Sequence, residues 1–137
     1  LDQIVDAYFF MSEGNYSANL DFGDFEGFIQ TIGGVPMASK FQKNRAKHAK
    51  NIALCTTTGP NTKYFSTKDH KEEFKTHINV MNMDYKGHFV IFSNDDDYVL
   101  FNYFKDIDNQ TSVLIKSKTV AEAERAQFNV FSKKLGN

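Results

Sequence analysis

The residues that could carry out chemistry are few and widely separated. His48, His70, His77 and His88 show no spacing with acids or thiols that is typical of a metal site. The consecutive aspartates at positions 95–97 indicate an exposed acidic loop, because a calcium loop needs further oxygen ligands at wider spacing. The sequence contains no phosphate-cradling glycine loop and no GxSxG nucleophile motif. We therefore predict no metal, no cofactor and no enzymatic activity.

The single cysteine, Cys55, is the remaining candidate nucleophile. A catalytic thiol needs a neighbouring group that lowers its pKa, and the sequence identifies no such group. One cysteine also permits no internal disulfide. We expect Cys55 to be a buried structural thiol.

Length and charge narrow the classes of function. A chain of 137 residues is expected to form a single domain, 1–137, with a substantial core. Its 16 basic and 17 acidic residues nearly cancel, so we expect no nucleic-acid partner. No apolar run approaches the ~18 residues of a membrane span. Aromatic residues reach 15%, which is more than a small core usually needs.

Two weak signals favour secretion. The sequence begins at Leu1 rather than methionine, which fits the removal of a signal peptide. The segments Asn15-Tyr16-Ser17 and Asn109-Gln110-Thr111 both match the glycosylation sequon. We therefore expect a secreted protein.

The C-terminal third carries the clearest pattern of elements. The aromatic and β-branched run 98–104 predicts a strand, and the polar connection 105–109 joins it to a second strand at 111–116. Thr119 and Glu122 match a capping box that begins a helix, and Gly136 stands where its C-cap would be. The apolar face of that helix is predicted to consist of Val120, Phe128, Phe131 and Leu135.

The earlier segments predict mostly strands. The dense apolar run 4–11 indicates a buried strand, and the polar segment 13–24 a long loop. Residues 25–32 fit either a second strand or a helix, and both readings stay open. The basic stretch 40–51 has good helix propensity, but we interpret it as a solvated edge strand or hairpin. Further strands are predicted at 52–58, 62–67, 74–83 and 89–92.

This arrangement resembles the lipocalin family. The turn 94–98 is similar to the family's TDY-like turn, and Lys116 or Lys118 stands in place of its basic residue. The first motif is degenerate, with Asp6-Ala7-Tyr8 where the family has glycine, a variable residue and tryptophan. Tyr8 is either a plug at the closed end of a barrel, contacted by that lysine, or an ordinary core aromatic. The resemblance implies a mainly β fold: an eight-stranded antiparallel up-and-down barrel with one C-terminal helix outside.

The resemblance also implies a function. A secreted lipocalin carries a small hydrophobic ligand, such as an odorant, a pheromone or a lipid, in its barrel cavity. An intracellular fatty-acid-binding barrel is the alternative, and a cysteine-dependent isomerase using Cys55 is a distant third. Monomer and dimer both stay open. The residues expected to line the cavity are Phe25, Ile29, Phe89, Ile91, Phe101, Tyr103 and Leu114.

Overall fold

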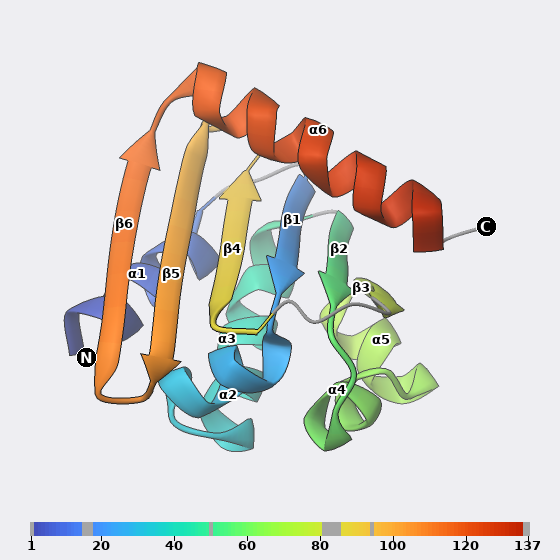
Figure 1. Cartoon of the computed structure of the whole chain (residues 1–137). Coiled ribbons are helices and arrows are strands. Elements are labelled where there is room, and N and C mark those ends of the chain that lie inside the picture. The colour runs from blue at the N-terminus through green and yellow to red at the C-terminus, as the bar shows by residue number, and fades with distance from the viewer. Residues whose placement is uncertain (1, 15–17, 50, 81–85, 94, 136–137) are drawn as a thin grey trace.

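An open mixed sheet, rather than a closed barrel, organises the chain. The computed structural model describes residues 2–14, 18–49, 51–80, 86–93 and 95–135. Its six strands are arranged in the order β3-β2-β1-β4-β5-β6 (Figure 1). They are β1 (Ala18–Gly23), β2 (Asn51–Thr56), β3 (Thr76–Val80), β4 (His88–Ser93), β5 (Tyr98–Asp106) and β6 (Asn109–Lys116).

The helices cover the two faces of this sheet unequally. They are α1 (Asp2–Ser12), α2 (Phe25–Ile32), α3 (Val35–His48), α4 (Pro60–Phe65), α5 (Lys68–Phe74) and α6 (Lys118–Leu135). Helices α1 to α5 lie behind or below the sheet, and α6 alone crosses its front at one end (Figure 1). The core accordingly has two parts, one beneath α1, α2 and α3 and a smaller one beneath α6.

The predicted eight-stranded barrel is wrong, and the strand directions explain why. Strands β1, β2 and β3 run parallel to one another, so each connection between them must cross over the sheet through helices. Only β4, β5 and β6 form the antiparallel meander that was expected. The edge strands β3 and β6 stand at opposite ends of the sheet, which therefore does not close.

The N-terminal run is a helix and not the predicted first strand. Tyr8 and Met11 are fully buried on α1, with Ile4 partly buried against the same core. Their spacing of four and three residues places them on one helical face. A dense apolar run hides this period, because the residues between these positions are also apolar. Tyr8 is thus a core aromatic in edge-to-face contact with Phe28 and Phe41, and not a barrel plug.

Three further segments also form helices. Residues 25–32 are α2, in which Asp24 caps the N-terminus by accepting a hydrogen bond from the Gly27 amide at 3.0 Å. Gly33 ends this helix in the left-handed region at φ 109°. The basic stretch predicted as an edge strand or hairpin belongs largely to α3, and the predicted strand 62–67 belongs largely to α4.

The two strands and the helix predicted in the C-terminal third are confirmed. The hairpin β5–β6 and the helix α6 lie where expected, and Phe128 is buried against the sheet. The helix cap differs: the Ser117 hydroxyl accepts from the Val120 amide at 3.2 Å, whereas Thr119 is exposed. The expected C-cap Gly136 and the sequon residue Asn15 lie outside the described residues.

A buried ion pair joins the sheet to α3. Asp21 of β1 and Arg45 of α3 are each 1% exposed and form a direct ion pair. Arg45 also donates to the Gln42 side-chain oxygen at 2.8 Å and stacks over the Phe41 ring at 4.8 Å. Burial raises the pKa of Asp21, and the neighbouring Arg45 guanidinium opposes that rise. The charge of each partner is therefore tolerated only because the other is present.

Removing Arg45 should therefore destabilise the fold strongly. Arg45→Met is expected to lower the free energy of unfolding by about 3–5 kcal/mol, because it leaves a buried carboxylate without its cation. The double variant Asp21→Leu with Arg45→Met should recover most of this loss, because neither charge is then buried. Urea denaturation of the two variants provides the measurement. A single variant as stable as the parent would contradict the role assigned to the pair.

The helix cap gives a second stability prediction. Ser117→Ala should cost about 1 kcal/mol, because it removes the oxygen that accepts from the Val120 amide. Thr119→Ala should change stability by much less, since Thr119 is exposed. Thermal denaturation of both variants compares the two positions directly. The larger loss at Thr119 would assign the cap to the residue that the sequence indicated.

Candidate nucleic-acid interface

Part of the front of the sheet carries aromatic side chains that α6 does not cover. We define the open sheet face as His88, Phe101, Tyr103, Thr111 and Val113, which share one face of β4, β5 and β6 and of which Phe101 borders the cluster beneath α6. Tyr103 is 50% exposed and Val113 42% exposed, whereas His88 and Phe101 are half-buried. Single exposed apolar residues are common on a protein surface, but neighbouring ones that form a contiguous patch make a face a candidate for binding.

Three rings of the open sheet face form a row. The Phe101 and Tyr103 rings are 4° from parallel, with centroids 6.3 Å apart. His88 is paired with Tyr103 across β4 and β5, and its ring centroid lies 5.6 Å from that of Tyr103. Burial lowers the pKa of His88, and the Asp24 carboxylate opposes this effect only in part. The lowered pKa favours the uncharged imidazole, which adds a third aromatic ring to the row.

Two lysines lie near this row, at one end of the sheet. The Phe104 amide donates to the Gly87 carbonyl at 2.6 Å, so the two strands stay paired beyond His88 and Tyr103. Lys86 lies in the turn before β4 and Lys105 at the irregularity in the pairing of β5, and both are exposed. Both also line a cleft at this end of the sheet. Both lysines therefore stand at the cleft, two residues along the chain from His88 and Tyr103.

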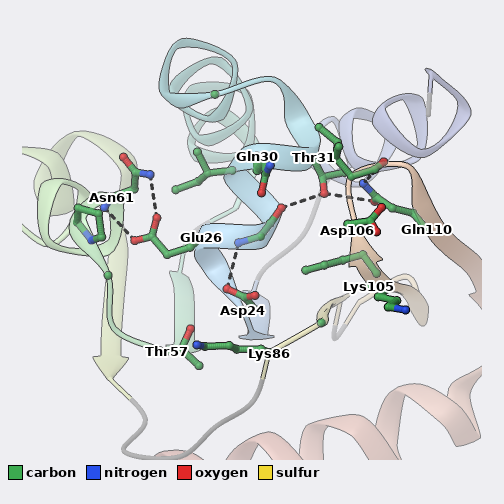
Figure 2. Close-up of a pocket in the computed structure, with 18 of the residues that line it drawn as sticks. Asp24, Glu26, Gln30, Thr31, Thr57, Asn61, Lys86, Lys105, Asp106 and Gln110 are labelled. Carbon is green, nitrogen blue, oxygen red and sulfur yellow. Dashed lines mark hydrogen bonds between the residues drawn. The ribbon is translucent and has the colours of Figure 1, made fainter.

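The cleft has a volume of about 770 Å³ and lies between α2, α4 and the β5–β6 hairpin (Figure 2). Helix α2 supplies Asp24, Glu26 and Gln30, while the hairpin supplies Asp106 and Gln110. Phe104 closes one side, since a side chain on Gly27 would meet its ring at 2.2 Å. The cleft thus combines polar groups with an aromatic wall.

Most of its carboxylates already have structural partners. Glu26 accepts from the backbone amides of Asn61 and Thr62, both at 2.9 Å, and so caps the N-terminus of α4. Asp24 caps α2 in the same way, and Asp106 accepts from the Asn109 side chain at 2.9 Å. These acids therefore hold the loops in place.

Four of the residues predicted to line a ligand cavity are instead packed in the core. Phe25 and Ile29 lie on α2, and Phe89 and Ile91 lie on β4. All four belong to the cluster beneath α1, α2 and α3 and are at most 2% exposed. Stacked and tilted rings fill this space, such as Phe28 on Phe89 at 4.8 Å.

The other three predicted residues do not join that group. Phe101 and Tyr103 lie together on the opposite face of the sheet, as their shared strand parity predicted. Leu114 lies on β6, 41% exposed, on the same face as Leu100 with which it is paired. The structure therefore brings Phe101 and Tyr103 together but separates them from the remaining five.

The sequence reading missed Lys86, Lys105 and the polar residues of the cleft. The lysines stand two positions from His88 and from Tyr103, but Lys86 lies in a turn and Lys105 at an irregularity of β5, so strand alternation did not reveal them. No local pattern marked Glu26 either, whose partners lie 35 and 36 residues further along the chain.

The described residues show neither a metal-binding cluster nor a helix that could span a membrane. Among them, no group of three or more His, Cys, Asp and Glu side chains is placed to hold a metal ion. No helix there combines the length and the apolar character needed to cross a membrane. That the protein has no enzymatic activity stays a prediction. That it is secreted also stays a prediction.

The similarity of this chain to a known protein is one of structure. No family model and no curated protein matches the sequence. A solved structure does match: TrmBL2, described as an archaeal chromatin protein that shows a novel mode of DNA binding. The TM-score is 0.66 at 19% sequence identity, over 96% of this chain and 49% of the TrmBL2 chain. The chain shares the fold of about half of TrmBL2.

The match to TrmBL2 corrects several expectations. The lipocalin resemblance is wrong, because TrmBL2 is not a lipocalin and the sheet does not close. The expected function as a secreted carrier of a small hydrophobic ligand is also wrong, because it depended on a barrel cavity that the open sheet does not form. The expectation of no nucleic-acid partner is also contradicted, because TrmBL2 binds DNA. Near-zero net charge describes the whole chain and not the distribution of charge over one surface.

Cys55 lies on β2 beneath α6, fully buried beside Phe22, Val90 and Phe92. The prediction that the Cys55 thiol is buried is therefore confirmed. Burial raises the pKa of Cys55 to about 11.

This thiol should react slowly in the folded protein. At pH 8 only about one Cys55 in a thousand would be ionised, because the pKa lies about three units higher. Iodoacetamide should therefore label the native chain far more slowly than the chain in concentrated urea, as measured by mass spectrometry. Equal rates in the two conditions would contradict the buried position.

Proposed function

We propose that this chain binds nucleic acid, and unpaired DNA bases in particular, through the open sheet face. The observation that carries the proposal is the row of the half-buried rings of His88 and Phe101 with the exposed ring of Tyr103, with Lys86 and Lys105 close by in the chain. The shared fold with TrmBL2, which binds DNA, supports the same class of ligand. Because the match spans 49% of TrmBL2, the activity of a whole TrmBL2-like protein is part of this proposal.

Stacking accounts for the affinity. Each base that stacks on an exposed aromatic ring gains about 1–3 kcal/mol, and this holds for any base because every base has a π-face. Phe101 and Tyr103 present parallel rings on one strand, and the ring of His88 extends the row across β4. A surface of this kind binds bases that are free to leave the duplex stack.

The lysines account for the salt dependence. Lys86 and Lys105 stand beside the row, where a backbone phosphate would follow a stacked base. Each phosphate contact to a single strand contributes roughly −0.7 to the slope of log affinity against log salt concentration. Two contacts therefore give a shallow slope.

Binding can be measured by fluorescence anisotropy with a labelled single-stranded oligonucleotide and its duplex. The single strand should bind more tightly, and Tyr103→Ala should weaken its binding about tenfold, because one stacking partner is lost. Lys86→Ala with Lys105→Ala should weaken binding and also flatten the salt dependence.

Matched controls use the same residue types elsewhere on the surface. Tyr64→Ala removes a tyrosine of similar exposure, 44%, from α4. Lys47→Ala removes an exposed lysine from α3. Neither should change the affinity. If Tyr103→Ala bound as tightly as the parent, or if the control variants lost as much affinity, the open sheet face would not be the binding surface.

A further inference from the structure

The edge strand β6 is available for pairing. It ends the sheet on the β5 side, and among the described residues its only strand partner is β5 (Figure 1). An edge strand presents one row of backbone amides and carbonyls with no partner inside its own sheet. Proteins usually protect such an edge with a proline, a bulge, a central charge or a covering helix.

Among the residues that the structure describes, none of those devices protects β6. Its eight residues contain no proline, and the irregularity in its pairing lies before the strand, between Phe104 and Asp106. Its one charged residue is Lys116, at the very end. Val113 and Leu114, at its middle, are 42% and 41% exposed on opposite faces of the sheet. The edge is therefore long, regular and partly apolar.

The charges at its two ends have opposite signs. Asp106 and Asp108 occupy the hairpin end, and Lys116 and Lys118 occupy the other end, all of them exposed. A strand with this distribution complements itself when a second copy runs in the opposite direction. A parallel arrangement would place like charges together instead.

We propose that β6 pairs antiparallel with β6 of a second copy, which joins the two sheets across a two-fold axis. Opposed residues on antiparallel strands point to the same face, so the axis must pass through one residue and its equivalent. With Ser112 at the axis, Thr111 faces Val113 of the second copy and Gln110 faces Leu114. Asp108 then lies opposite Lys116, once on each side of the axis.

A groove beside the edge supports a second copy as the occupant. A hollow of about 360 Å³ runs between α1 and β6, lined by Gln3, Ile4, Ala7, Gln110, Ser112 and Leu114. In the proposed pairing, Leu114 of the second copy lies opposite Gln110 and so reaches this groove. Strand pairing with these few side chains is small for a protein interface, so the dimer should be weak and depend on concentration.

Two charge variants test both the dimer and its register. Sedimentation equilibrium of the parent, without nucleic acid, should show a monomer–dimer equilibrium. Asp108→Lys and Lys116→Asp should each raise the dissociation constant by roughly tenfold, because two attractive pairs become repulsive in each homodimer. An equimolar mixture of the two variants should restore dimerisation, since both ion pairs re-form in the heterodimer. High salt should reduce these differences.

Control variants on α5, Lys68→Asp and Asp69→Lys, change equally exposed charges away from the edge. They should leave the dissociation constant unchanged. A parent that stays monomeric up to millimolar concentration would overturn the proposal. So would a dimer that ignores the β6 charges, or a mixture that fails to re-associate. The test is independent of DNA binding, so failure of one proposal leaves the other standing.

Discussion

The ion pair between Asp21 and Arg45 constrains the architecture from the inside. Asp21 belongs to β1, which lies between β2 and β4, so its carboxylate is buried in the middle of the sheet. A charge in that place is tolerated only beside a cation, and α3 supplies it. Helix α3 must therefore lie across β1, on the face towards which Asp21 points. The long connection from β1 to β2 is fixed to the back of the sheet as a result.

This constraint leaves the two faces of the sheet unequal. The two crossovers and α1 share one face, where Phe25, Phe28 and Phe89 form a continuous aromatic core. On the other face, α6 is the covering helix among the described residues, and it contacts the end of the sheet near Phe128. The rows of β4, β5 and β6 below α6 keep their aromatic side chains without a covering layer. Surface available for binding is thus a consequence of which face holds the buried charge.

The sequence correctly predicted the elements whose signals lie within a few neighbouring residues. It did not predict the features that depend on contacts between residues far apart in the chain. The β5–β6 hairpin and α6 were found because alternation, connection length and helical spacing all lie within a few residues of one another. The helix at α1 was missed because its run is apolar at nearly every position, which obscures the period. Parallel pairing of β1 with β2 joins residues about thirty positions apart, and no local pattern reveals it.

The same distinction applies to the candidate site. Strand parity correctly placed Phe101 and Tyr103 on one face, because the alternation of side chains is a local property. Whether that face is a cavity wall or a surface depends on which helices cover it, and this is decided by α3 and α6. A hairpin followed by a helix occurs in more than one architecture, so this order of elements alone could not separate a barrel from an open sheet.

The position of the Glu26 carboxylate affects how an anion would bind at this end of the sheet. Its carboxylate already occupies the amide end of α4, and a side chain on Gly59 would meet it at 2.2 Å. The protein thus carries its own permanent counter-ion at the place where a phosphate would otherwise compete. An incoming phosphate is excluded from the backbone amides there, which leaves the flexible ammonium groups of Lys86 and Lys105 to receive it. Recognition at this rim would then be tolerant of geometry, as suits a polymer whose bases rather than phosphates are held in fixed positions.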